Sequence, residues 1–238
     1  MIQYAIKNGY KRRYNLLFTI TLLLFAFCAA VSLSACAPVS PYTIDINYNP
    51  GDTTPEFNKN NWKLLLTVAK FNDLRQEEDK MVIGKVIKSD GTEIPVFPKF
   101  RIPSDAVTHA VKDYLTKAGN RLSTDTPAWD LKNDTINQEW GDIIIGGNIH
   151  EFEIICNKKL PIRKYTARVK FVAAFANVRK PETIVKITVE STPTLEHIRF
   201  SEEKIEEVMN DAMSIAIRRV FESQEINRIF IDAAKEIN

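Results

Sequence analysis

Two neighbouring stretches of the chain have an apolar side chain at every second position, and this alternation limits the possible folds more than any other feature. In the first stretch, from Tyr165 to Phe175, Arg168 and Lys170 occupy positions in between. The second stretch, from Val185 to Val189, alternates with lysine and threonine. A period of two places the apolar side chains of a strand on one face. The pattern therefore predicts an antiparallel hairpin with one buried and one solvated face.

Other apolar patterns predict further strands and helices. Strands are expected at residues 62–71 and 142–156, and a hairpin with a turn at Ser89-Asp90-Gly91 is expected at residues 82–96. Helical spacing of apolar residues follows Pro103, follows Ser201 and continues from Ile226 to Ile237. The last stripe is expected to pack on the domain, with docking into a partner as the alternative. Because no βαβ unit repeats, the order predicts an α+β fold, with a mostly antiparallel sheet and two or three helices packed on one face.

Two features interrupt the regular patterns. Gly146-Gly147 lies inside the strand expected at 142–156, and the apolar phase shifts beyond it, which predicts a β-bulge at the glycines. Residues 123–141 are polar and include Pro127, so they are expected to form a long irregular loop that carries Trp129. Long loops of this kind are often functional.

The first 35 residues differ in character from the rest. They contain four basic residues and no acidic one, and an apolar run from Leu16 to Val31 follows the basic region. This layout is typical of a secretory signal peptide. The whole chain has 32 basic and 30 acidic residues, so without those four the mature chain has 28 − 30 = −2 charges. A chain so close to neutral offers no broad cationic field to phosphate backbones, which argues against nucleic-acid binding.

The residues after the apolar run carry a resemblance. Leu33-Ser34-Ala35-Cys36 resembles the lipobox of bacterial lipoproteins, in which the signal peptide is cut off before the cysteine and the cysteine receives the lipid. This resemblance implies that residues 1–35 are removed and that acyl chains on Cys36 anchor the protein in a membrane. By the same resemblance, Ala37 after the cysteine implies sorting to the outer membrane, with the domain facing the periplasm.

Composition divides the mature chain into a tether and a domain. Prolines and short polar residues, without periodicity, follow the cysteine, so residues 36–61 are expected to form the lipidated cysteine and a flexible tether. Residues 62–238 are then expected to form a single α+β periplasmic domain, because a segment of this length is long enough to bury one core.

A second resemblance covers most of residues 62–221. Residues 68–75 read VAKFNDLR, and Ile83-Gly84 follows them. The expected helix after Pro103 ends with the sequence Leu-Thr-Lys-Ala-Gly at residues 115–119. The chain then closes with two expected strands and a helix. This plan resembles the YajG-type family of bacterial lipoproteins. The resemblance implies an outer-membrane lipoprotein and supplies no active site. The 123–141 loop and the helix after Ser223 depart from the family's plan.

Few side chains of the mature chain could support catalysis or bind a metal. Apart from Cys36 it contains one cysteine, Cys156, and three histidines, His109, His150 and His197, which lack metal-ligand spacing. On one strand His150 and Cys156 lie too far apart for a thiol-protease pair. Cys156 is expected to be a small buried residue. We therefore expect no enzyme activity, no catalytic residue, no metal and no cofactor.

The remaining hypotheses concern binding. The first is a non-enzymatic adaptor that binds another envelope protein through the 72–81 segment, the 123–141 loop or the C-terminal helix. Asp73, Arg75 and Trp129 are its candidate partner-binding residues. The alternative is a binding module for peptidoglycan or a lipid component of the envelope. The sequence predicts no particular oligomeric state.

Overall fold

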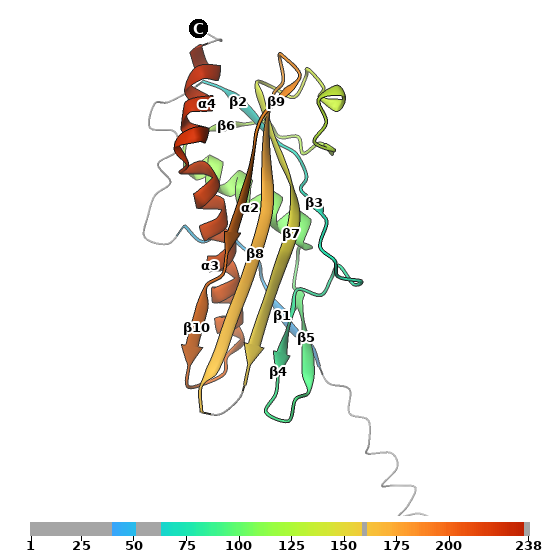
Figure 1. Cartoon of the computed structure of the whole chain (residues 1–238), viewed down its shortest axis with the longest axis vertical. Coiled ribbons are helices and arrows are strands. Elements are labelled where there is room, and N and C mark those ends of the chain that lie inside the picture. The colour runs from blue at the N-terminus through green and yellow to red at the C-terminus, as the bar shows by residue number, and fades with distance from the viewer. Residues whose placement is uncertain (1–39, 51–62, 159–160, 236–238) are drawn as a thin grey trace, which may run out of the picture. The chain divides into compact units, whose positions relative to one another are not determined.

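Two long strands, β7 (Ile143–Asn157) and β8 (Arg163–Asn177), form the centre of the sheet (Figure 1). They pair antiparallel, from Ile143 opposite Asn177 to Asn157 opposite Lys164. On its other edge β8 pairs antiparallel with β9 (Glu182–Ser191) and then with β10 (Thr194–His197). The predicted hairpin is confirmed as β8 and β9, and every second side chain from Tyr165 to Phe175 is buried.

The computed structural model describes residues 40–50, 63–158 and 161–235. Residues 41–238 form one compact unit, and residues 1–40 are assigned to another. The signal peptide expected at 1–35 and the lipidated Cys36 therefore lie outside the described residues. Within the described ranges, no helix combines the length and the apolar character that crossing a bilayer requires.

On the far edge of β7 the strands run parallel to it. Successive parts of β7 pair with β2 (Leu65–Val68), β3 (Asn72–Asp73) and β4 (Gly84–Ile87). Beyond them, β6 (Arg121–Leu122) is parallel to β2 and β5 (Glu93–Pro98) is antiparallel to β4. The sheet is therefore mixed, and the expectation of a mostly antiparallel sheet is wrong. The parallel pairs join segments far apart in the sequence, which local alternation does not reveal.

Three helices cover one face of the sheet: α2 (Pro103–Lys117), α3 (Glu202–Phe221) and α4 (Gln224–Lys235). Their buried side chains belong to the main hydrophobic cluster, together with the inward residues of β7 and β8. α3 begins where the sequence predicts, because the Ser201 hydroxyl accepts a hydrogen bond from the backbone N–H of Lys204. The α+β class is thus confirmed.

The helix α4 packs on the domain, as its apolar stripe predicts. Ile226 and Phe230 are fully buried. The Phe230 ring meets the Phe175 ring of β8 edge-on, with ring centroids 6.1 Å apart. The buried side chains of α4 therefore belong to the main cluster and contact β8.

The opposite face of the sheet is covered in part by the 123–141 loop, which includes the short helix η1 (Asn133–Thr135). Trp129, Leu131 and Ile136 form a second cluster with side chains of β7 and β8. Ile144 faces this second cluster, whereas its neighbours on β7 face the main one. Both faces of β7 are therefore buried at this end.

Gly146 and Gly147 make room for one aromatic ring on each face of β7. A Cβ on Gly146 would lie 2.8 Å from Cε3 of Trp129, and a Cβ on Gly147 would lie 2.3 Å from Cε1 of Phe71. Both distances are shorter than van der Waals contact, so a larger residue would displace a ring. The bulge predicted at these glycines is wrong, because the irregularity in the β7–β8 pairing lies at His150.

Residues 41–48, which the composition assigned to the tether, belong to the domain. β1 (Tyr42–Ile44) pairs parallel with β5. The side chains of Ile44, Ile46 and Tyr48 are buried in the main cluster, and the backbone N–H of Asp45 donates to the Glu206 carboxylate at 2.9 Å. The expectation of a tether over 36–61 is therefore wrong for this part, because the alternate apolar residues between Pro41 and Pro50 are buried in the main cluster.

Phe230→Ala is expected to lower the free energy of unfolding by about 3 to 5 kcal/mol, because it removes a fully buried ring from the main cluster. The melting temperature, measured by circular dichroism, should fall by several degrees. Ile231→Ala is the matched control, since Ile231 of the same helix is 36% exposed, and it should change the curve little. An unchanged curve for Phe230→Ala would show that α4 contributes nothing to the core.

Candidate functional site

Arg75 is a buried arginine just after β3, and its guanidinium organises the loop that follows. The side chain is 3% exposed. Its Nε donates to both carboxylate oxygens of Asp73, at 3.0 and 3.2 Å, and its Nη2 donates to Oδ2 of Asp73 at 2.9 Å. Two parallel charge-assisted hydrogen bonds fix both the position and the orientation of the guanidinium.

The other Arg75 hydrogen bonds reach backbone carbonyls on two sides. Nη1 donates to the carbonyl of Val82 at 2.9 Å and to that of Phe152 on β7 at 3.3 Å. Nη2 donates to the carbonyl of Lys80 at 2.6 Å, and the Lys80 ammonium donates to the carbonyl of Arg75. One buried cation thus ties both ends of the 74–83 loop to β7.

The Asp73 carboxylate stays charged beside this cation. Burial by itself raises the pKa of Asp73, but hydrogen bonds from Arg75 and the charges of Arg75 and Lys80 outweigh burial and place the pKa below its ordinary value. Asp73 is therefore an anion at neutral pH. The hydrogen bonds of both partners offset part of the free-energy cost of removing the two charges from water.

Ile83-Gly84 brings β4 against β7 beside this ion pair. Gly84 has a φ of +150°, and a Cβ at this position would lie 1.9 Å from the carbonyl oxygen of Ile154. Only glycine permits this approach. Asp73, Arg75, Ile83 and Gly84, on which the family resemblance partly rests, therefore form one structural unit.

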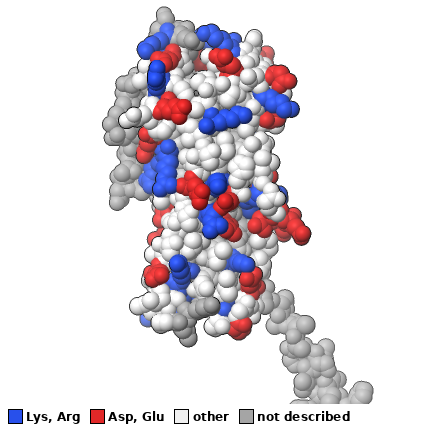
Figure 2. Space-filling model, viewed as in Figure 1, with Lys and Arg blue, Asp and Glu red and all other residues white. Residues whose placement is uncertain are grey.

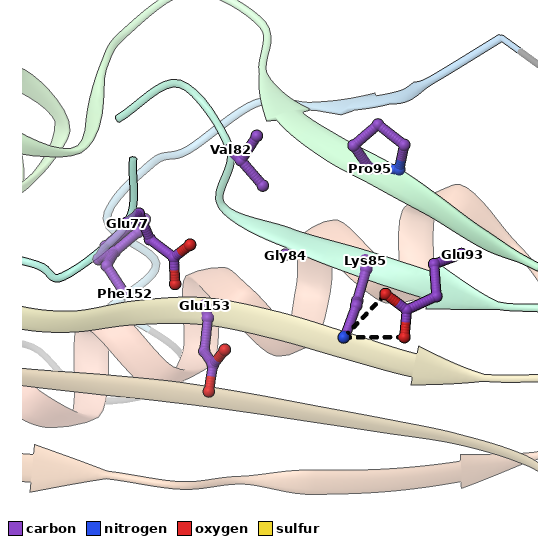
Figure 3. Close-up of a pocket in the computed structure, with 8 residues that line it drawn as sticks. All are labelled: Glu77, Val82, Gly84, Lys85, Glu93, Pro95, Phe152 and Glu153. Carbon is purple, nitrogen blue, oxygen red and sulfur yellow. Dashed lines mark hydrogen bonds and ion pairs between the residues drawn. The ribbon is translucent and has the colours of Figure 1, made fainter. Parts of the chain in front are cut away.

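A groove of about 300 Å³ opens on this unit (Figure 3). Its lining combines apolar and charged side chains around Gly84: Val82, Pro95, Phe152, Glu77, Lys85, Glu93 and Glu153. Lys85 pairs with Glu93 at 2.9 Å, and Glu153 lies 3.3 Å from the Arg168 guanidinium outside the groove. Three carboxylates and one ammonium line the groove, so its charge is negative.

A second, more open hollow lies on the solvated face of the sheet and shares the same loop. It is lined by Leu74, Gln76, His150, Glu151, Lys170, Val172 and Thr188. Ion pairs cross the strands here, with Arg168 3.4 Å from Glu151 and Lys170 3.6 Å from Glu190. Figure 2 shows positive and negative side chains interspersed on the side that faces the viewer. The 74–83 loop thus contributes to the walls of two hollows.

The structure places the predicted partner-binding residues beneath the surface. Trp129 is 2% exposed, and its Nε1 donates to the carbonyl of Lys132 at 2.9 Å. Its own carbonyl accepts from Nδ2 of Asn72 at 3.3 Å, which places it close to Asp73. Asp73 and Arg75 therefore lie beneath the loop beside the groove, whereas Trp129 packs against Gly146 in the second cluster, away from the groove lining. Among the groove carboxylates, only Glu77 lies in the 72–81 segment predicted to contact a partner, and Glu93 and Glu153 carry no signal in the sequence.

The structure also separates His150 from Cys156. Both lie on β7, but the irregularity at His150 shifts the alternation, so His150 is exposed and Cys156 is fully buried, as expected for the cysteine. Burial raises the pKa of the Cys156 thiol to about 11, so the sulfur is protonated at neutral pH and a poor nucleophile. Among the described residues, no group of three or more His, Cys, Asp or Glu side chains could hold a metal ion.

Asp73→Asn is expected to destabilise the protein at neutral pH, because it leaves the buried Arg75 guanidinium without its counter-ion. The pKa of Asp73 is lowered in the folded state. Its charge therefore contributes stability above the unfolded-state pKa of about 4, and this contribution is lost as the pH falls through the folded-state pKa. Urea unfolding at pH 7 and pH 3 should show a smaller difference between Asp73→Asn and the natural chain at pH 3. An equal difference at both pH values would contradict the assignment.

No family model and no curated protein matches the sequence. Among solved structures, protein XCC0632 from Xanthomonas campestris, of family DUF330, superimposes with a TM-score of 0.51 at 12% identity, over 82% of this chain and 99% of that chain. A homolog of neuraminyllactose-binding hemagglutinin from Helicobacter pylori gives 0.42 at 12% identity, over 82% and 99%. Lipoprotein GNA1162 from Neisseria meningitidis gives 0.38 at 8% identity, over 67% and 99%. At such identity the likeness to XCC0632 shows a shared fold and nothing further.

Proposed function

We propose that this chain is a lipid-anchored protein of the bacterial envelope that binds another envelope protein and catalyses no reaction. The basic and apolar leader and the Leu33-Ser34-Ala35-Cys36 sequence support lipidation of Cys36. Ala37 and the resemblance to the YajG-type family support the outer membrane, with the domain facing the periplasm. The fold shared with XCC0632 is compatible with this role and does not specify it.

The binding role depends on one observation: the 74–83 loop exposes apolar side chains although a buried arginine holds it in place. Leu74 is 48% exposed and Met81 is 42% exposed. A loop that is already ordered loses little conformational entropy when a partner binds. Covering its apolar side chains then contributes favourable free energy. This combination suits a recognition surface.

The groove beside the loop indicates the chemistry of the partner. Its floor includes Phe152, and Glu77 has no ion-pair partner among the described residues. A partner segment with a lysine or arginine next to an apolar side chain would satisfy both features, because the long stem of such a residue packs on apolar surface while its charge meets the carboxylate. We therefore assign the groove to a basic, partly apolar segment of another protein.

Cys36→Ala is expected to abolish lipid attachment and leave an unprocessed precursor, because the thiol is the group that receives the lipid. Labelling with radioactive palmitate in cells, followed by gel electrophoresis, measures this directly. Cys28→Ala is the matched control, since Cys28 lies in the apolar run and should label like the natural chain. Labelled Cys36→Ala protein of mature size would refute the anchor.

A photo-crosslinking residue in place of Met81 is expected to capture a partner protein in intact cells. Glu77→Arg should weaken that crosslink about tenfold or more, because like charges placed in contact cost several kcal/mol. Glu182→Arg is the control, since Glu182 is an exposed carboxylate at the start of β9, and it should leave the crosslink unchanged.

Two outcomes would overturn the proposed partner. A crosslink that survives Glu77→Arg would exclude the groove. Co-sedimentation of the purified protein with murein sacculi, in the absence of a protein crosslink, would favour the peptidoglycan-binding alternative.

A further inference from the structure

Several turns and strand ends lie at the same end of the domain as Pro41, where the described chain enters the domain. β1 begins at Tyr42 and runs parallel to β5, so residue 41 lies toward the end of the sheet where β5 starts. The β4–β5 turn, the end of β7, the start of β8 and the end of β10 lie at this same end, which is the lower end in Figure 1. We call this the entry end.

The entry end exposes two isoleucines that lie next to one another. The last pair of the β8–β10 ladder joins Arg163 to His197, and the residues immediately beyond this pair are Ile162 and Ile198. Ile162 is 48% exposed and Ile198 is 77% exposed. In the described part of the chain, no other large apolar side chain is as exposed as Ile198.

Cationic and aromatic residues neighbour the two isoleucines in the sequence, together with the exposed carboxylate of Glu196. Arg163 adjoins Ile162 and Arg199 adjoins Ile198. Nearby, the Lys158 ammonium lies 3.2 Å from the Phe200 ring centroid and donates to the Tyr42 hydroxyl at 2.9 Å. Apolar tips flanked by arginines and half-buried aromatic rings suit the boundary between lipid headgroups and acyl chains.

The length of the chain before the domain limits how far this end can lie from a bilayer. Pro41 is only five positions after Cys36 in the sequence. An extended chain covers at most about 3.6 Å per residue, so this segment spans no more than roughly 18 Å. If Cys36 carries the lipid, the entry end is held within this distance of the headgroups.

We propose that the entry end rests on the membrane, with Ile162 and Ile198 inserted at the headgroup boundary and with Arg163 and Arg199 against lipid phosphates. This inference rests on the proposed lipidation of Cys36. The acyl chains supply the affinity, and the contacts at the entry end fix the orientation of the domain.

The test uses the full lipidated chain in vesicles of phosphatidylethanolamine and phosphatidylglycerol. Ile198→Cys is labelled with an environment-sensitive fluorophore, and the label is confined to this position because Cys156 is buried. We expect blue-shifted emission that nitroxide lipids quench and aqueous iodide does not. Ile184→Cys is the matched control, since Ile184 is 38% exposed on β9 at the opposite end of the sheet, and its label should respond to iodide alone.

Further variants test whether the two arginines contact lipid phosphates or only lie near the membrane. Arg163→Glu with Arg199→Glu should shift the emission at residue 198 toward that of water, because lipid phosphates repel the new carboxylates. If Ile198→Cys does not fold, a label at Ile162→Cys gives the same readout.

The outcomes separate this inference from the proposed anchor. Protein that floats with the vesicles while residue 198 reports water would overturn the orientation and leave the anchor intact. Emission that ignores the charge reversal would overturn the phosphate contact. Protein that does not float would overturn both.

Discussion

The strand β7 is the element on which the rest of the domain depends, because it is hydrogen-bonded along both edges. β8 follows one edge in antiparallel register, and β2, β3 and β4 follow the other in parallel. At its start both faces are also covered, one by the helix layer and one by the loop that carries Trp129. This explains why Ile143, Ile144 and Ile145 are consecutive and all fully buried. A strand buried on both faces has a continuous apolar run rather than alternation.

Arg75 holds the 74–83 loop against β7. The segment between β3 and β4 leaves the sheet and returns to it, and it must be held against β7 where it returns. The guanidinium supplies donors to the Lys80, Val82 and Phe152 carbonyls while Asp73 balances its charge. A buried ion pair adds little net stability over apolar packing, but it specifies one geometry. Here the fixed geometry positions Glu77 and Val82 of the loop, which line the groove.

The proposed groove lies near the entry end of the domain. Gly84 at the groove lies opposite Ile154, and Ile87 at the end of β4 lies opposite Asn157. The separation is three residues, or about 10 Å at the usual strand rise. If the entry end rests on a membrane as proposed, a partner in this groove meets the domain near the bilayer.

Periodicity in the sequence predicts the β8–β9 hairpin, the helices α2, α3 and α4, and an apolar stripe at Ile226 and Phe230 that must be covered, because each depends on a pattern within one short segment. The motifs behind the family resemblance include Asp73, Arg75, Ile83 and Gly84, but the sequence does not show that these residues form one unit. The folded structure alone shows that β7 has parallel neighbours, that residues 41–48 pack in the domain, and that Trp129 is buried. Each of these depends on pairing between distant segments. No local pattern records such a pairing, because its hydrogen bonds and contacts exist only once the chain has folded.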